Sequence, residues 1–308
     1  MSPLPISPRV VALIHNPVFE KQGGRKLHEL MGWNNPDNLA QEYIRDVAEA
    51  SHGLVQYRIV ERHEIDGFPR LADGYTYNDE TFLRCWRARS GFHKPDGADY
   101  LDLLRTVDFM SKAQLNLADE LWLFGFPYAG YYESAMGGRG AFWCNAPPID
   151  GTQHIPRRFV VMGFNYERDV GCMLEDLGHR AESIMEEVFR NTSASANLWR
   201  QFTRYDQTSP GQAACGNVHF APNSDRDYDW GNRGMVRSTC DDWLQYPALS
   251  GKSRLVNCAE WGNGDMRAHH IWWMQRFPHS DGTTPAGIRN NWWSYIHLDH
   301  LDSITNFR

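Results

Sequence analysis

Four short apolar runs alternate with helical patterns over the first 190 residues, and this alternation constrains the fold more than any other feature of the sequence. The runs are continuous and end in polar or turn-forming residues, as buried strands do. They are RVVALI (9–14), LVQYRIV (54–60), ELWLFGF (120–126) and RFVVMGF (158–164). Strands that alternate with helices pair in parallel, so the pattern predicts an α/β fold with a mostly parallel sheet.

Segments between these runs have the spacing of amphipathic helices. Residues 38–50 form the first, with Asp37 or Asn38 as its expected N-cap, and residues 98–118 form a second, longer helix. A third helix is expected after the fourth run, with Asp169 in the N-cap position. These are the flanking helices of the predicted layer.

The character of the chain changes after residue 190, where Gly, Pro, Asn, Asp and Trp dominate. We expect residues 1–190 to form the α/β core and residues 191–308 to form a loop-rich region that packs against it within the same domain. Of the 12 Trp residues, eight lie after residue 190. They are expected to fill a core or to form exposed stacking platforms for sugars and other rings.

The charge and length of the chain exclude several kinds of partner. A formal net charge of -7 without clustered Lys and Arg argues against a nucleic-acid binder. No apolar run approaches the roughly 18 residues that span a bilayer, and the N-terminal sequence lacks the pattern of a targeting segment. We therefore expect a soluble protein, cytoplasmic or secreted after removal of a signal peptide, that acts on a small molecule, a peptide or a glycan.

The six cysteines include no CxxC pair, which argues against a zinc ribbon or a thioredoxin-type site. Three of them lie between residues 215 and 258. Disulfides in an oxidising compartment and buried free thiols are both compatible with this pattern.

Each strand-like run leads into a loop that carries functional groups: HNP, ERHEIDGFP, PYAGYYES and NYERD in chain order. Ligands of open α/β sheets bind at the carboxyl ends of the strands, so a site is expected among these loops. Glu133 lies in the third loop between aromatic residues. A carboxylate in such surroundings can serve as a general acid or base; a Glu that caps a helix or faces water is the alternative.

The stretch EDLGHRAE (175–182) places Glu175, His179 and Glu182 on one side of the third predicted helix, at i, i+4 and i+7. The apolar stripe of the same helix lies opposite. A solvated helix face would show this pattern too. However, acids that share a face without a Lys repel one another, and a bound cation would relieve that repulsion.

The five residues EDLGH (175–179) resemble the HExxH helix of zincin metallopeptidases. In that motif two His at i and i+4 bind zinc and the Glu after the first His is the general base. His179 stands in the place of the second His, Glu175 replaces the first, and Asp176 replaces the Glu. The resemblance implies a metal held by Glu175 and His179 and a water activated by Asp176. A mixed carboxylate and imidazole set suits Zn, Mn or Fe.

Residues 215–232 form the densest polar segment of the chain. Asp225, Asp227 and Asp229 alternate there, and their oxygens are of the kind that Ca²⁺ prefers, although a turn-rich surface loop explains the same pattern. His219 lies in the apolar setting NVHF. It is interpreted as an additional metal ligand or acid/base group, with a hydrogen-bonded core His as the alternative.

Together these features favour a metal-dependent hydrolase that acts on a peptide, amide or glycan-related substrate. Glu175 and His179 would bind the ion, Glu182 or His219 would complete the set, and Asp176 or Glu133 would activate the water. A metal-independent glycoside hydrolase is one alternative, with Glu133 and a second carboxylate such as Glu175 or Asp229 flanking a sugar. A non-catalytic carbohydrate-binding protein is the other.

Overall fold

The computed structural model describes residues 4–298 of the chain. These residues divide between two compact units. The sheet unit comprises Pro8–Glu42 and Tyr57–Asp176, and the aromatic unit comprises residues 4–7, Tyr43–Gln56 and residues 177–298. The division between the two units lies inside a helix, between Asp176 and Leu177, whereas the boundary at residue 190 stays a prediction.

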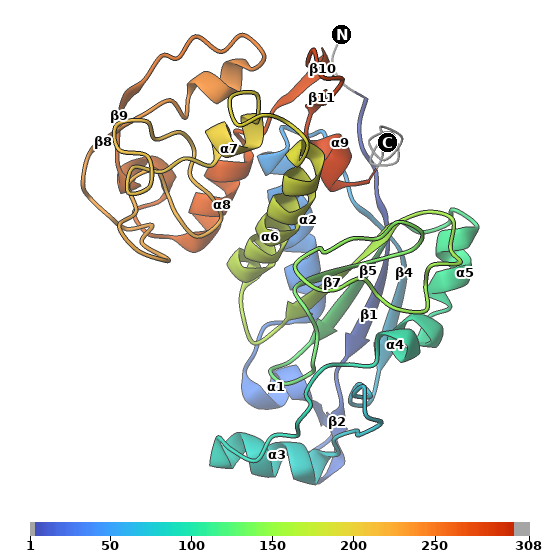
Figure 1. The fold of residues 1–308 in the computed structure, drawn as a ribbon. Helices are drawn as coiled ribbons and strands as arrows, with labels where there is room; N and C mark the ends of the chain where they lie inside the picture. The colour runs from blue at the N-terminus through green and yellow to red at the C-terminus, as the bar shows by residue number, and fades with distance from the viewer. Residues whose placement is uncertain (1–3, 299–308) are drawn as a thin grey trace. The chain divides into compact units, whose positions relative to one another are not determined.

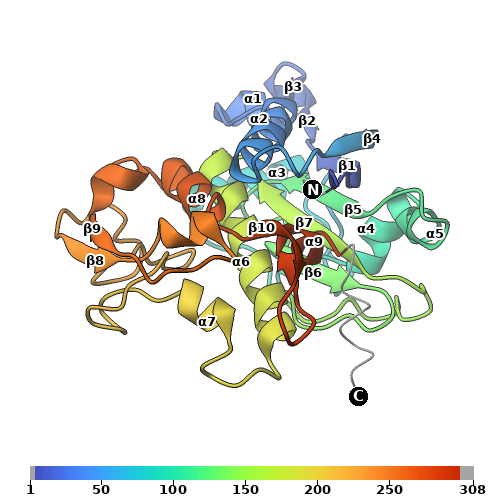
Figure 2. The ribbon, with the colours of Figure 1, turned by 90° about the horizontal axis from the view of Figure 1, so that it is seen from above.

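The sheet unit contains a five-stranded sheet in the order β4-β1-β5-β7-β6. The strands are β1 (Arg9–His15), β4 (Arg58–Ile65), β5 (Glu120–Gly125), β6 (Ser134–Gly137) and β7 (Phe159–Asn165). All neighbours pair in parallel except β6, which runs antiparallel to β7 at one edge (Figures 1 and 2). The predicted α/β fold with a mostly parallel sheet is confirmed.

The second strand was predicted too early in the chain. β4 begins at Arg58, and Val55 forms instead an isolated parallel bridge with Ile6 in the aromatic unit. The sequence of β4, RIVERHEI, is largely charged and its first residues are exposed. Charged side chains are common on edge strands because they discourage pairing with other chains.

One face of the sheet packs against α4 (Tyr100–Thr106) and α5 (Phe109–Gln114). The core residues of the strands on this face are Val11, Leu13, Leu121, Leu123, Phe159 and Val161, and those of the helices include Leu103, Leu104, Phe109 and Ala113. The single helix predicted over residues 98–118 is thus two helices. Asp108 interrupts it with φ 48°, in the left-handed region that does not continue an α-helix.

Three further helices of the chain have clear local causes. α2 (Pro36–Ala50) begins with a proline, and Asn35, not the expected Asp37 or Asn38, accepts from the first free N–H groups. α6 (Val170–Phe189) begins as predicted, because Asp169 accepts from the N–H of Gly171 at 2.9 Å. α3 (Asp79–Ala88), which was not among the predicted helices, is capped by Asn78.

Short elements of the sheet unit precede α2: β2 (Val18–Phe19), η1 (Glu20–Gln22), β3 (Arg25–Lys26) and α1 (Leu27–Met31). After α6, the aromatic unit has only short elements joined by long loops, as predicted (Figure 2). They are α7 (Leu198–Phe202), β8 (Val236–Ser238), η2 (Asp242–Gln245), β9 (Arg254–Val256), η3 (Cys258–Trp261), α8 (Met266–Met274), β10 (His279–Thr283), β11 (Arg289–Asn291) and α9 (Trp293–Ile296).

The eight Trp residues after residue 190 are all buried, none more than 7% exposed. The interpretation of these residues as exposed stacking platforms is therefore wrong. Trp199, Trp273 and Trp292 instead contact one another and neighbouring Phe rings. Because this unit has little helix and strand, few of its elements present an aliphatic face to a core. Large aromatic rings supply the buried apolar surface instead.

The six cysteines are free thiols, and five of them are buried. This agrees with the free-thiol alternative. Within residues 4–298, no helix is both long enough and apolar enough to cross a membrane.

The buried imidazole of His15, at the end of β1, makes stability depend on pH. Burial lowers its pKa from 6.5 to about 4. An unfolded chain takes up this proton below about pH 6.5, whereas the folded protein does so only near about pH 4, so the free energy of unfolding falls as the pH decreases between these values. When the pH is lowered from about 7 to about 4.5, the free energy of unfolding measured in urea should fall in both proteins. We expect this fall to be about 2–3 kcal/mol smaller in His15→Asn than in the wild type. His63→Asn, at a partly exposed site on β4, is the control; equal pH dependence of His15→Asn and wild type would contradict the prediction.

Candidate metal centre

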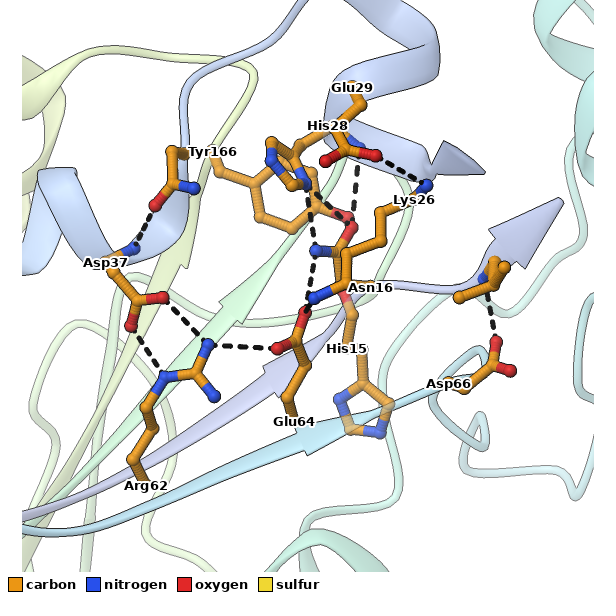
Figure 3. Close-up of polar contacts among 12 residues, drawn as sticks. His15, Asn16, Lys26, His28, Glu29, Asp37, Arg62, Glu64, Asp66 and Tyr166 are labelled. Carbon is orange, nitrogen blue, oxygen red and sulfur yellow. Dashed lines mark hydrogen bonds and ion pairs between the residues drawn. The ribbon is translucent and has the colours of Figure 1, made fainter. Parts of the chain in front are cut away.

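Polar side chains meet at the carboxyl ends of β1 and β4, where the sequence predicted a site (Figure 3). The amide of Asn16 donates to Glu64 at 3.0 Å and lies 2.9 Å from Nδ1 of His28. Glu64 also accepts from Lys26 at 2.6 Å and Arg62 at 3.0 Å. Burial raises the pKa of Glu64, but these hydrogen bonds outweigh it and lower the pKa to about 2. The network joins opposite charges and holds the loops that follow both strands.

The same edge carries a second contact, between the ends of β1 and β5. The hydroxyl of Tyr131 lies 2.7 Å from Nδ1 of His15, and the hydroxyl of Tyr166 donates to the carbonyl of His15 at 3.1 Å. These contacts tie the end of β1 to Tyr131, two residues before Glu133, and to Tyr166, the residue that follows β7.

Helix α6 presents the stripe that the sequence predicted. Leu177, Ala181, Ile184 and Val188 are buried, as expected for its apolar side. Glu175, His179 and Glu182 are half-buried on the opposite side. A wholly solvated face would leave these three side chains exposed, so the chain covers this side of the helix too.

His219 of the aromatic unit lies beside His179, with the ring centroids 4.7 Å apart. Glu175, His179 and His219 each offer one ligand atom, and these atoms lie within 4.8 Å of one another. α6 is one continuous helix across the division of the chain, so Glu175 keeps its place one turn before His179. The structure thus places His219, not Glu182, in the group with Glu175 and His179.

Each histidine has a carboxylate at its Nδ1 atom. Glu182 Oε2 lies 3.2 Å from Nδ1 of His179, and Asp227 Oδ1 lies 3.0 Å from Nδ1 of His219. A carboxylate at this position favours the tautomer with its proton on Nδ1, in which Nε2 can bind a metal. Glu182 and Asp227 are therefore in the positions of residues that orient ligands.

The loop of residues 216–220 is held on two helices of the aromatic unit. Glu182 on α6 accepts from the N–H of Val218 at 3.2 Å. On α8, Nε2 of His270 lies 3.1 Å from the carbonyl of Val218, and the indole N–H of Trp273 donates to the carbonyl of Gly216 at 3.0 Å. These contacts fix the backbone next to His219.

Gly178 allows this loop to approach α6. A Cβ atom at Gly178 would lie 2.5 Å from Cγ2 of Val218, which is closer than such atoms pack. Gly216 has φ 74°, and a Cβ there would lie 2.0 Å from the carbonyl oxygen of Phe220. Gly178 is needed for the close contact between helix and loop, and Gly216 is needed for the tight turn within the loop.

Two of the predicted catalytic residues, Glu133 and Asp176, both belong to the sheet unit. Asp176 is buried, and burial raises its pKa well above the usual range, with a further increase from the charges of Glu133 and Glu175 that Arg168 opposes. Glu133 is exposed and accepts from the amide of Asn145. The structure therefore brings Glu133, Asp176 and Glu175 close enough for their charges to interact.

The three aspartates proposed to bind Ca²⁺ all interact with neighbouring protein side chains. Asp225 and Asp229 both accept from the amide of Asn232, at 3.0 and 3.1 Å, whereas Asp227 pairs with His219. These hydrogen bonds agree with the surface-loop alternative. Calcium binding at this loop stays a prediction.

Two residues that support the loop next to His219 could not be related to it from the sequence. His270 and Trp273 act on backbone carbonyls more than fifty positions earlier in the chain, so no local spacing relates them to His219. Asp227 was noticed, but only as one of an alternating set.

The chain matches no protein-family model, no curated protein and no solved structure in the comparisons made with each. The interpretation of the centre therefore depends on its geometry.

Substitution of Gly178 tests whether the loop of residues 216–220 packs closely against α6. In an open helix Gly→Ala stabilises by about 1 kcal/mol. We expect Gly178→Ala instead to lower the free energy of unfolding by about 1–3 kcal/mol, because the new methyl group collides with Val218. In urea unfolding, Gly178→Ala combined with Val218→Ala should be more stable than the sum of the single changes predicts. A stabilised Gly178→Ala would contradict this account.

Proposed function

We propose that the protein is a divalent-metal-dependent hydrolase in which Glu175, His179 and His219 bind the ion. The proposal depends on one observation: three ligand atoms lie within 4.8 Å of one another. The carboxylates at the two Nδ1 atoms add to its support. Catalytic zinc sites have three protein ligands of the His and carboxylate type and keep a position for water, and the same set suits Mn or Fe.

A metal bound here would supply a nucleophile near neutral pH by lowering the pKa of its water. Glu182 and Asp227 would orient the two imidazoles. Glu133 is the favoured proton acceptor because its carboxylate is exposed, whereas Asp176 is only 8% exposed. The resemblance of EDLGH to the zincin helix would then extend to the placement of the ligands, with the acceptor supplied from the loop after β5.

Removal of either histidine tests the proposal. We expect one bound zinc per chain in the wild type, and in His179→Ala or His219→Ala the loss of that metal together with at least a 100-fold loss of p-nitrophenyl acetate hydrolysis, which is about 2.7 kcal/mol of transition-state stabilisation. Metal analysis and initial rates measure the two quantities. His154→Ala, at an exposed histidine, is the control.

The two alternatives predict different results from chelation. A glycoside hydrolase that used Glu133 with Glu175 or Asp229 would keep its activity in EDTA, and a carbohydrate-binding protein would show no turnover. A wild-type protein that is purified without metal and does not bind added Zn, Mn or Fe would overturn the proposed function.

The role of Glu182, whose carboxylate lies at Nδ1 of His179, can be tested separately. We expect Glu182→Gln to weaken zinc binding about 10- to 100-fold, because Gln no longer offers a charged acceptor to Nδ1. Glu186→Gln, one turn further along α6 at an exposed position, should leave the affinity unchanged. Competition with a fluorescent zinc chelator measures both. Equal affinities for the two variants would show that Glu182 has only a structural role.

A further inference from the structure

An open cavity of about 820 Å³ lies between the β2–η1 segment and α3. Both of its walls belong to the sheet unit, in which β2 and α3 lie side by side (Figure 1). Pockets that bind small molecules in proteins have volumes of about 300–1,000 Å³. The cavity is therefore large enough for a small-molecule ligand.

Protein contacts hold the two walls of the cavity together. Phe19, at the end of β2, is buried, and its ring contacts Phe68 edge-on with the centroids 6.3 Å apart. Phe68 packs in turn against Phe82 on the buried side of α3, at 5.4 Å. On the solvent side, Nζ of Lys21 lies 2.5 Å from Oε1 of Glu80. A cavity that is ordered before its ligand arrives loses less entropy on binding.

Apolar side chains face the cavity from both walls. Phe19 lies on the β2 side, and Leu83 and Ala88 lie on α3. Leu83 follows the core residue Phe82 by one position, which turns it about 100° around the helix, and it is nevertheless half-buried. This lining favours a ligand with an apolar body.

Two cationic side chains of the cavity have no counter-charge. The lining includes three acidic and three basic residues, which are Glu20, Asp79, Glu80, Lys21, Arg84 and Arg87. Arg84 and Arg87 are exposed, and within residues 4–298 neither guanidinium forms an ion pair or a hydrogen bond. They lie three positions apart on one side of α3, where like charges repel each other. An anionic group would relieve this repulsion and accept hydrogen bonds from both guanidinium groups.

The acidic side chains lie at the other end of the cavity and limit the charge of the ligand. Asp79 precedes Arg87 by eight positions, which is about 12 Å along the helix. Glu20 and Asp79 would repel a second anionic group placed at their end. Since the acidic and basic residues of the lining are equal in number, a singly charged head group suits the cavity better than a doubly charged one.

We propose that this cavity binds a small amphipathic carboxylate, such as a medium-chain fatty acid. Its head group would accept hydrogen bonds from Arg84 and Arg87, and its chain would lie along Leu83 and Phe19. The inference does not depend on the proposed function, because it requires neither a metal nor turnover.

Titration calorimetry of the full-length protein with sodium decanoate, below its micelle concentration, tests the ligand class. EDTA is added because a carboxylate could also bind a metal at the candidate metal centre. We expect saturable binding of one decanoate per chain. Acetate, which lacks the chain, and decyltrimethylammonium, which has a cationic head group, should each bind at least about tenfold more weakly. A lack of saturable decanoate binding, or equal binding of either comparison ligand, would overturn the inference.

Variants of the two arginines test the position of the head group. We expect Arg84→Gln combined with Arg87→Gln to weaken decanoate binding about tenfold, because the charged hydrogen bonds to the head group are lost. Arg105→Gln removes the same charge from an exposed position on α4, outside the cavity, and is the matched control. An affinity of the double variant equal to that of the wild type would contradict the proposed site.

Amide hydrogen exchange locates the ligand without any substitution. Saturating decanoate should slow exchange in residues 19–22 and 78–88, which form the two walls. Protection confined to another part of the chain would place the ligand elsewhere and overturn the inference. Metal content and p-nitrophenyl acetate hydrolysis decide the proposed function separately, so either can fail while the other stands.

Discussion

The carboxylate of Glu182 is the contact on which the candidate centre depends. One of its oxygens lies beside Nδ1 of His179 and the other accepts from the backbone N–H of Val218, the residue before His219. A single side chain thus orients one imidazole and fixes the backbone that carries the other. Both contacts need the loop close to α6, which the missing side chain of Gly178 permits. If the loop did not pack closely against α6, His179 and His219 would not lie side by side.

The two units make their cores in different ways. The sheet unit buries aliphatic residues of alternate strand positions against α4 and α5, as a parallel sheet with helices requires. The aromatic unit has few regular elements and fills its interior with Trp and Phe. Two of its indole N–H groups, those of Trp261 and Trp273, donate to backbone carbonyls. The same residues therefore provide packing and hold loops, including the loop next to His219.

Sequence reasoning was most successful where the evidence was local. Continuous apolar runs predicted β1, β5 and β7 nearly to the residue, and a helical stripe predicted which side of α6 is buried. It was least successful where the tertiary fold determines which residues are buried. Val55 looks like part of a strand but pairs with Ile6, and the Trp residues look like a surface but lie inside. Asp108 ends a helix that periodicity would continue, because its left-handed backbone depends on its surroundings.

By itself, the sequence determined the strand and helix periods of the α/β layer and the placement of Glu175, His179 and Glu182 on one side of a helix, since these follow from spacings of a few residues. Only the tertiary structure decided that His219 joins Glu175 and His179, and that Glu182 and Asp227 lie beside Nδ1 of the two histidines. The reason is physical: contacts between residues far apart in the chain are selected by packing and hydrogen bonding of the whole fold, which leave no periodic trace in the sequence.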